Sequence, residues 1–511
     1  MGKYLVGIDE GTMGCKTCIF DLDGNLIAYD YREYRSIYPA PGRVEQDPLE
    51  LTEALYVSCK TAIKQAGIDP KEILGLGLST QGGVIGPADK NGEILGNFIG
   101  WQDTRCTETK PDINYIYPMD QYYEKEGWSI RGSMHPFRTY IWLKENDPEF
   151  FEQASRWMTN QEYFLRKFGV DGFYTDASSA CREGLADTNN FKYSEELLNT
   201  LGIDVSKKGE IVCHGTVVGH VNEMVAERTG LAVGTPVCVA ALDQDCSTFG
   251  AGLLRNGDVC VVMGTLGACY VASDKGIRDK QERLIVKSHT YFEKGPNTFT
   301  IEAMSTTSAS ALRWYRDQIS TFEKAYASMT DENAYDLITK QAEKSEAGAR
   351  GVTFLPYMTG ATARQNSEAR GTFTGIRLDT KQADLSRAVL EGISYEMLDI
   401  IRIIEQSGVE INTIRLVGGP VKSPFWCQVQ ADIYQRPVIV LQAPETGCLG
   451  AALFAGIGVG VYKDAYDAVD TAVKVKVTYE PNPEMREAYE EGFRRYLSVY
   501  EGLSSTGFGN K

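Results

Sequence analysis

Residues 5–14 read LVGIDEGTMG, an apolar run that ends in a carboxylate and a turn with glycine at both ends. A second stretch of the same form, CVVMGTLG, covers residues 260–267. More apolar residues follow each stretch, so each predicts a strand, a GTxG turn and a second strand. Glycine at both turn ends permits a positive φ and a close approach of the backbone to a ligand. Two such hairpins, one near the start of each half, indicate an internal duplication; two unrelated hairpins are the alternative.

Helix and strand patterns alternate around these hairpins. Asp47 is a helix-capping residue, Pro48 suits the first helical position, and Gly67 ends a run with apolar residues at spacing four. A strand over residues 73–78 follows, and residues 383–406 form a long amphipathic pattern. This alternation predicts an α/β protein.

The second hairpin also suggests where the chain divides. A domain boundary near residues 253–257, just before that hairpin, gives a first domain over 1–254 and a second over 255–511. Both have enough apolar residues for a core, since 43% of the chain is hydrophobic.

Charge and composition exclude several classes of protein. The net charge is −17 and no basic cluster occurs, which disfavours nucleic acid as a partner. No signal peptide is visible, and the most extended weakly polar stretch, 449–462, is too short to span a bilayer. The 12 scattered cysteines suit reduced thiols and a cytoplasmic location. The single CxxC pair, Cys15 and Cys18, would face opposite sides of a strand, which is poor for a shared metal.

The first hairpin carries the residues for phosphate and metal binding. Asp9 ends a buried strand, a costly place for a carboxylate unless its charge is used, and Mg²⁺ is a natural use. Thr12 and the turn N–H groups could hold phosphate oxygens, and Lys16 could add a cation. The GxxxxGK[ST] spacing of a P-loop is absent. An ordinary turn carboxylate is the alternative for Asp9.

A second carboxylate pair follows a predicted strand over residues 236–242. Asp243 would stand at the end of that strand, where a lone carboxylate can act as general base toward a hydroxyl. Asp245 is an equal candidate on the local pattern, and a helix cap is the alternative for Asp243.

Two segments near the end of the chain suit nucleotide binding and packing. Residues 416–424 run from a strand into Gly418-Gly419 and then a helix start at Ser423-Pro424, a turn that lets a flat adenine lie against the backbone. Residues 445–452 open a helix of small residues, which fits either a hinge or simple close packing.

Taken together these segments resemble the FGGY carbohydrate kinases, a branch of the actin-like ATPases. The two hairpins look like the family's phosphate hairpins, and residues 418–423 look like its adenosine motif. The most specific match is GTFTGI at 371–376 with residues 384–391 at the family's spacing. Similar segments lie at 42–48 (GRVEQDP), 101–105 (WQDTR) and 142–149 (WLKENDPE).

The resemblance implies two ribonuclease H-like α/β domains with a cleft, and phosphorylation of a hydroxyl of a small sugar or polyol by ATP with Mg²⁺. It favours Asp243 over Asp245 as base, because Gly250 and Gly252 follow Asp243 at the family's interval. The implied site residues are Asp243 as catalytic base; Asp9 for the metal; Gly11, Thr12, Lys16, Gly264, Thr265, Gly267, Gly418, Gly419 and Lys422 for ATP; and Gln81, Trp101, Asp103 and Asp243 for the acceptor.

Departures from the family pattern keep the acceptor open. Residues 79–83 (STQGG) lack the Met-His pair of xylulokinases and the Arg-Glu pair of glycerol kinases, residues 356–364 lack the common GERTP, and Leu242 replaces a glycine. A pentulose, a tetritol or a related compound fits. A sensor or scaffold that binds ATP and sugar without catalysis is the alternative, and an actin-like chaperone or filament protein is a third. The oligomeric state is open, with a homodimer among the options.

Overall fold

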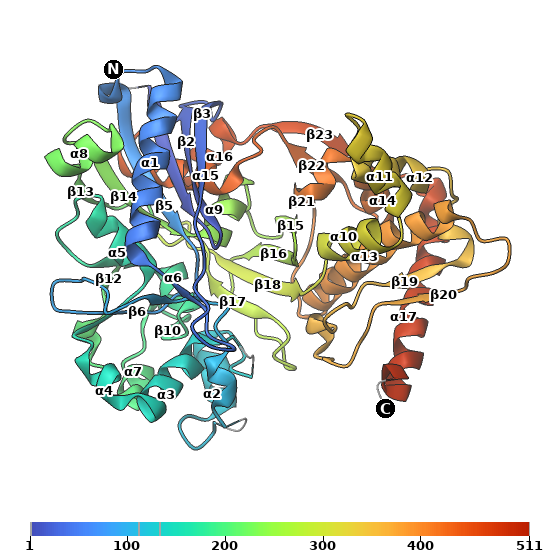
Figure 1. Cartoon of the computed structure of the whole chain (residues 1–511), viewed down its shortest axis with the longest axis horizontal. Helices are drawn as coiled ribbons and strands as arrows, with labels where there is room; N and C mark the ends of the chain where they lie inside the picture. The colour runs from blue at the N-terminus through green and yellow to red at the C-terminus, as the bar shows by residue number, and fades with distance from the viewer. Residues whose placement is uncertain (1–2, 111–112, 132–133, 510–511) are drawn as a thin grey trace.

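Two mixed sheets form the centres of two lobes in this computed structural model, which describes residues 3–110, 113–131 and 134–509 (Figure 1). The first sheet has the order β13-β14-β5-β1-β2-β3 and the second β17-β18-β16-β15-β21-β22-β23. The strands of the first are β1 (Tyr4–Glu10), β2 (Gly14–Asp21), β3 (Leu26–Glu33), β5 (Ile73–Thr80), β13 (Val217–His220) and β14 (Pro236–Leu242). Those of the second are β15 (Val259–Met263), β16 (Gly267–Ser273), β17 (Ile285–Ser288), β18 (Phe299–Ser305), β21 (Ile414–Gly418), β22 (Val438–Leu441) and β23 (Val475–Tyr479).

The two sheets share one topology. In the first, β1, β2 and β3 form an antiparallel meander, and β5 and then β14 add in parallel on the other side of β1. In the second, β15, β16 and β18 form the meander, and β21 and then β22 add in parallel beside β15. This repetition confirms the predicted internal duplication and the α/β class with two ribonuclease H-like halves.

Helices cover both faces of the first sheet. Helix α1 (Pro48–Ala66) begins and ends as predicted: the Asp47 side chain accepts from the Leu49 N–H, and Gly67 has φ 63°. It packs on β2 and β3 with Leu51 and Leu55 in the core. The first lobe also contains α5 (Asn160–Lys167), α6 (Ala177–Arg182), α8 (Glu223–Thr229) and α9 (Asp243–Gly250).

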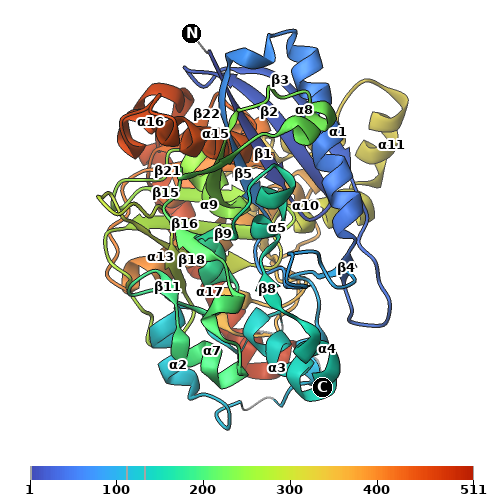
Figure 2. The same cartoon turned by 90° about the vertical axis from the view of Figure 1, so that its left-hand side faces the viewer.

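A smaller layer lies at the far end of the first lobe from β3 (Figures 1 and 2). Its helices are α2 (Met119–Glu126), α3 (Pro136–Asn146), α4 (Pro148–Gln153) and α7 (Glu195–Leu201). Its short strands form four pairs: β4 (Glu45–Gln46) with β7 (Phe98–Ile99), β6 (Gly86–Ala88) with β8 (Arg156–Met158), β9 (Tyr174–Asp176) with β12 (Glu210–Val212), and β10 (Ala186–Asp187) with β11 (Lys192–Tyr193). The layer has its own aromatic core around Tyr122, Tyr140 and Trp157.

The second lobe is built around one buried helix. Helix α13 (Gln382–Gln406) matches the predicted long helix, and most of its residues are buried. Packed around it are α10 (Ala309–Gln318), α11 (Thr321–Met329), α12 (Ala334–Ala342), α14 (Pro424–Tyr434), α17 (Arg486–Thr506), and the pair β19 (Thr353–Leu355) and β20 (Thr372–Thr374). The terminal helix α17 puts Tyr489, Phe493, Tyr496 and Tyr500 into the same core.

One late segment packs on the first sheet rather than the second. Helices α15 (Thr446–Gly458) and α16 (Ala465–Ala472) lie with β1, β5, β14 and α9 in one hydrophobic cluster, beside the blue strands in Figure 1. The contact is close because glycines face the helix: a Cβ added to Gly7 would lie 1.8 Å from the Cys448 carbonyl oxygen, and one on Gly77 would lie 2.0 Å from that of Ala451. The boundary predicted at 253–257 falls in the turn between α9 and β15.

The cysteines of the CxxC pair lie on opposite sides of the first sheet, as the sequence predicts. All 12 cysteines are free thiols. Cys15 belongs to the core on the α1 face of the first sheet, whereas Cys18 belongs to the core on the α15 face, so the CxxC pair is divided between two faces. In the described part of the chain, no helix is long and apolar enough to cross a membrane.

Candidate active site

The two GTxG turns connect strands, as the sequence predicts, but their glycines do not have the positive φ that glycine would permit there. None of Gly11, Gly14, Gly264 and Gly267 has a positive φ. A Cβ on Gly14 would lie 2.5 Å from the Arg32 carbonyl oxygen, so that glycine is needed for packing. Added Cβ atoms at Gly11 and Gly264 would meet no atom closer than 3.4 Å and 3.9 Å. These two positions leave the backbone open to a ligand.

Three side chains form hydrogen bonds with the first hairpin turn. The Gln46 amide donates to the Thr12 carbonyl at 2.9 Å, and the Tyr34 hydroxyl donates to the Gly11 carbonyl. The Trp101 indole N–H donates to Thr12 Oγ1 at 2.8 Å. Trp101, predicted to contact the acceptor, therefore lies directly against the predicted phosphate residue Thr12.

Asp9 stands at the end of β1 with its charge poorly compensated. The Ser79 hydroxyl donates to Asp9 Oδ1 at 2.9 Å, and Lys16 lies opposite on β2. Burial nevertheless raises the pKa of Asp9 to about 6, and the Ser79 hydrogen bond and the charge of Lys16 only partly oppose that shift. A carboxylate in this state gains most from a further cation.

Asp243 is the first residue of α9, directly after β14, as predicted. Its Oδ1 accepts from the Gln244 N–H at 2.8 Å, and its side chain keeps partial exposure. Burial and, to a smaller extent, the nearby charge of Asp9 raise the pKa of Asp243 to about 7. The charge of Asp9 thus opposes the ionisation of Asp243, although the two residues come from different parts of the first lobe.

Asp245 has a different environment, although it is only two residues away. Its carboxylate is fully buried and accepts from Lys287 Nζ at 2.8 Å, His289 Nδ1 at 3.2 Å and Thr300 Oγ1 at 3.1 Å. These partners outweigh burial and lower the pKa of Asp245 to about 2. Because both carboxylate oxygens have donors, Asp245 is a structural anchor between α9 and the second sheet and is poorly suited to accept a proton.

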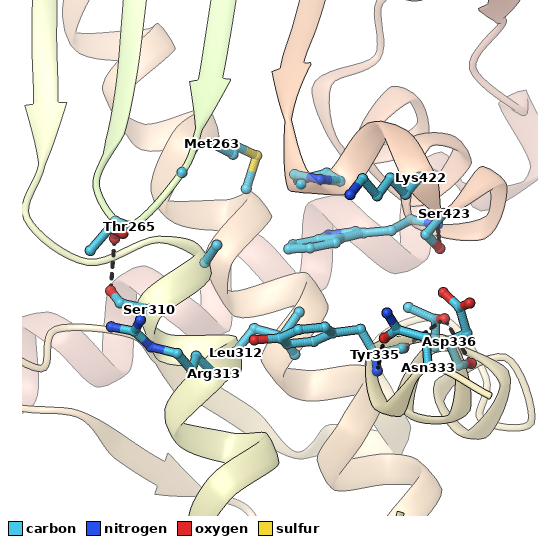
Figure 3. A pocket seen from close by; sticks show the side chains of 16 residues that line it. Met263, Thr265, Ser310, Leu312, Arg313, Asn333, Tyr335, Asp336, Lys422 and Ser423 are labelled. Atoms are coloured by element: carbon cyan, nitrogen blue, oxygen red, sulfur yellow. Dashed lines mark hydrogen bonds between the residues drawn. The ribbon is translucent and has the colours of Figure 1, made fainter. Parts of the chain in front are cut away.

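A cavity of about 390 Å³ opens beside the second hairpin, in the second lobe. Figure 3 shows Thr265 at one end and Lys422 and Ser423 along one wall, with Tyr335 from α12 on the opposite wall. The Ser310 hydroxyl donates to the Thr265 carbonyl at 2.8 Å, which fixes the hairpin on the start of α10. The cavity is lined by residues 263–265, 309, 310, 312, 313, 333, 335, 336, 339, 419, 420, 422, 423 and 426.

The glycine loop at the end of β21 separates this cavity from a second one of about 490 Å³, lined also by Glu445 and Thr446. Gly418 has φ 103°, and a Cβ there would lie 2.4 Å from the Met263 carbonyl oxygen, so the loop requires glycine. Ser423 caps α14 and Pro424 begins it, as the sequence predicts. Gly419 and Lys422 line both cavities.

Lys16 and Glu445 connect the first hairpin to that second cavity. Their side chains form an ion pair at 2.5 Å, and each is 27% exposed. A Cβ on Gly447 would lie 2.7 Å from Asp9 Oδ2, so the start of α15 sits directly on the Asp9 carboxylate. Lys16, the cation predicted to bind phosphate, is therefore paired with Glu445, which lines the second cavity together with the glycine loop.

Two of the residues predicted to bind the acceptor form hydrogen bonds with other residues of the protein. The Gln81 amide nitrogen donates to Glu10 at 2.7 Å and to Gln46 at 2.8 Å, although its buried Oε1 has no partner among the described residues. Asp103 accepts from Arg105 and from the Val44 N–H, at 2.8 Å each. Direct contact of Gln81 or Asp103 with an acceptor stays a prediction.

Sequence reasoning missed several residues that the fold brings to the site. Tyr335 and Trp426 line the 390 Å³ cavity, and Arg182 and Gln244 contact each other beside Asp243. Trp426 follows the recognised helix start by three residues and Gln244 follows Asp243 directly, so those two had a local signal. Arg182 and Tyr335 reach the site only through tertiary packing. Within the described ranges, no three His, Cys, Asp or Glu side chains are grouped to hold a metal ion.

Comparison with known proteins covers the chain almost from end to end. The N-terminal domain model of the FGGY family of carbohydrate kinases matches residues 4–250, and the C-terminal domain model matches residues 260–459. The chain belongs to the FGGY family of carbohydrate kinases. This FGGY chain is 30% identical to a glycerol kinase of Thermococcus gammatolerans over 485 residues, which cover 94% of each chain.

Other FGGY relatives carry different substrate names. A xylulose kinase of Staphylococcus epidermidis is 29% identical over 98% of this chain and 96% of its own length. A gluconokinase of Bacillus licheniformis is 26% identical over 99% of this chain and 97% of its own. The crystal structure of a xylulose kinase from Lactobacillus acidophilus shares the fold, with TM-score 0.88 and 23% identity over 99% of this chain and 100% of that one. The family makes this chain an ATP-dependent kinase of a sugar or polyol.

Proposed function

We propose that this FGGY kinase transfers the γ-phosphoryl group of ATP to a hydroxyl of a pentulose or a related small carbohydrate, with Asp243 as general base. The observation that carries the proposal is the environment of Asp243: a partly exposed residue at a strand end, beside Asp9, whose carboxyl pKa is raised to about 7. A base with a pKa near the working pH accepts a proton most effectively.

The reaction needs a positioned acceptor more than covalent help from the protein. The acceptor hydroxyl oxygen attacks the γ-phosphorus as its proton passes to the Asp243 carboxylate. The new O–P bond forms, the bond from the γ-phosphorus to the bridging oxygen breaks, and ADP leaves with that oxygen. The Gln244 N–H holds Asp243 Oδ1 in place.

The chain's residues suit ATP accompanied by Mg²⁺. Asp9 would hold the cation together with phosphate oxygens, as proteins commonly bind Mg²⁺ through one or two carboxylates plus substrate phosphates. The raised pKa of Asp9 fits this, because a nearby cation favours its ionised form. When bound, Mg²⁺ neutralises phosphate charge.

The nucleotide would bind through both hairpins and the glycine loop. The adenine would lie between Tyr335 and the Gly418-Gly419 loop, with Lys422 at its edge. The phosphates would then reach Gly264, Thr265 and Gly267 on one hairpin. Gly11, Thr12 and Lys16 would contact them on the other hairpin.

A panel of ketoses, sugar acids and polyols with coupled ADP detection tests the proposal. Acceptor-dependent ADP release, with the phosphate position determined by NMR, is the expected result. A sensor or scaffold of the same fold would instead bind ATP and sugar in calorimetry without releasing ADP. That second result would overturn the proposal.

A cytoplasmic location and a homodimeric state remain predictions of this proposal. Size-exclusion chromatography with light scattering would distinguish a dimer from a monomer of 56.5 kDa.

A further inference from the structure

A buried arginine beside Asp243 has a covered guanidinium nitrogen without a hydrogen-bond partner among the described residues. Arg182 ends α6, and its side chain is only 10% exposed. Its Nη2 donates to Gln244 Oε1 at 3.1 Å and lies 3.4 Å from Glu302 Oε1. Its Nη1 is covered and lacks a partner among the described residues.

This arrangement is costly unless another molecule supplies an acceptor. A buried donor without a partner loses its hydrogen bonds to water, and the loss is larger for a charged group. The guanidinium cannot relieve that cost by losing its proton, since arginine stays charged in proteins. Nη1 therefore needs an oxygen from outside the chain, either from water or from a ligand.

The surroundings of Arg182 bring its guanidinium close to Asp243. One face of the guanidinium stacks on the Trp128 ring at 4.8 Å. Its Cγ would be 2.7 Å from a Cβ on Gly82, so the glycine turn packs on the arginine stem. Asp243 lies close enough for its charge to act on the guanidinium. The molecule that gives its proton to Asp243 must therefore also lie near this guanidinium.

The chemistry of the free nitrogen indicates which acceptors it favours. Arginine only donates, its fork is planar, and its strongest partners are oxygens that carry full or partial negative charge. Gly82 and Gly83 add no side chain that could compete for Nη1. A neutral hydroxyl accepts more weakly than a carbonyl or carboxylate oxygen.

We infer that Arg182 Nη1 donates to an sp² oxygen of the acceptor, either the carbonyl of a ketose or the carboxylate of a sugar acid, and so selects these compounds against polyols of the same length. The inference rests on the proposed function, because it assumes that the acceptor meets Asp243.

Three five-carbon compounds test this selection: D-xylulose with a carbonyl, D-xylonate with a carboxylate, and xylitol with neither. Steady-state kinetics would compare the wild type with Arg182→Met. Loss of a charge-assisted hydrogen bond of this kind corresponds to a rise in KM of about 10- to 100-fold. We expect that rise for the carbonyl or the carboxylate compound, with the xylitol KM changed by less than about threefold. Which compound loses more identifies the oxygen.

Arg156→Met is the matched control, because Arg156 also stacks on an aromatic ring, Phe173, at 3.6 Å and donates to the Lys208 carbonyl. It should leave the ranking of the three acceptors unchanged. If Arg182→Met does not fold by near-UV circular dichroism, Arg182→Lys takes its place, since it keeps the charge and loses the planar fork. An intermediate rise in KM for the same acceptor is then expected.

Two outcomes would overturn the inference while leaving the proposed function intact. In one, the Arg182 variants raise KM equally for all three acceptors. In the other, kcat falls with KM unchanged, which would make Arg182 a positioning residue that acts through Gln244. If the wild type phosphorylates no sugar, sugar acid or polyol, both the proposed function and the inference fail.

Discussion

Replacing Asp243 with asparagine should lower turnover and raise stability at the same time. Asparagine keeps the oxygen that accepts from the Gln244 N–H at 2.8 Å, so the start of α9 is preserved. It cannot take the proton of an acceptor hydroxyl. General-base catalysis contributes about 10²- to 10⁴-fold, and kcat should fall by that factor.

The stability change follows from the pKa of Asp243, which folding raises from 3.8 to about 7. A carboxyl with a raised folded-state pKa destabilises the fold when ionised, and the penalty grows as pH rises from about 4 to about 7. Each pH unit corresponds to about 1.4 kcal/mol, so the full penalty has an upper limit of about 4 kcal/mol. Partial exposure reduces it through solvent screening. Asp243→Asn should therefore melt at a higher temperature than the wild type at pH 8, with the gain vanishing near pH 4.

The assay combines coupled ADP release with differential scanning fluorimetry at several pH values. Asp245→Asn is the matched control on the same helix. It breaks a buried ion pair with Lys287, and losing one partner of such a pair costs about 3–5 kcal/mol. That variant should melt earlier at every pH above about 4. A wild-type kcat in Asp243→Asn, or a lower melting temperature at pH 8, would refute the reasoning.

Three further substitutions test the residues proposed to contact ATP. Gly418→Ala should strain the loop by about 1–3 kcal/mol and raise the KM for ATP by roughly 5- to 100-fold, whereas Gly460→Ala, at φ 76° with open space around it, should leave that KM unchanged. Tyr335→Ala should raise the KM for ATP and not that for the acceptor; the opposite pattern would remove Tyr335 from the adenine site. Lys16→Met removes a cation that lowers the pKa of Asp9, so the acidic limb of the pH profile of kcat/KM should move to higher pH. An unchanged pH profile would contradict the electrostatic effect of Lys16 on Asp9.

Local patterns predicted the elements and the strand ends well. The Asp47 cap, Pro48 and Gly67 fixed α1, and the strand before Asp243 is β14 as expected. These features depend on neighbours in sequence, so a single chain carries enough information. The two hairpins similarly predicted an internal duplication, and the two sheets do share one topology.

Long-range packing explains what the sequence did not reveal. Whether Asp243 or Asp245 could serve as base depended on Lys287 and His289, which are more than 40 residues away and give Asp245 its donors. The glycines of the turns were expected to adopt unusual backbone angles, yet Gly14 is required by contact with β3. Such contacts have no local signature.

The position of α15 and α16 has a consequence for how the protein is made. Leu5, Phe20 and Phe249 on the first lobe are covered by residues 446–472, which are synthesised only after strand β22 of the second sheet. A nascent first lobe would carry an uncovered apolar surface until residues 446–472 have been made, so a chaperone or a slow collapse of the lobe would have to protect it until then. Residues 1–254 made alone should bind a hydrophobic dye and aggregate, and a monomeric, dye-silent fragment would show that the lobe matures without its late cover.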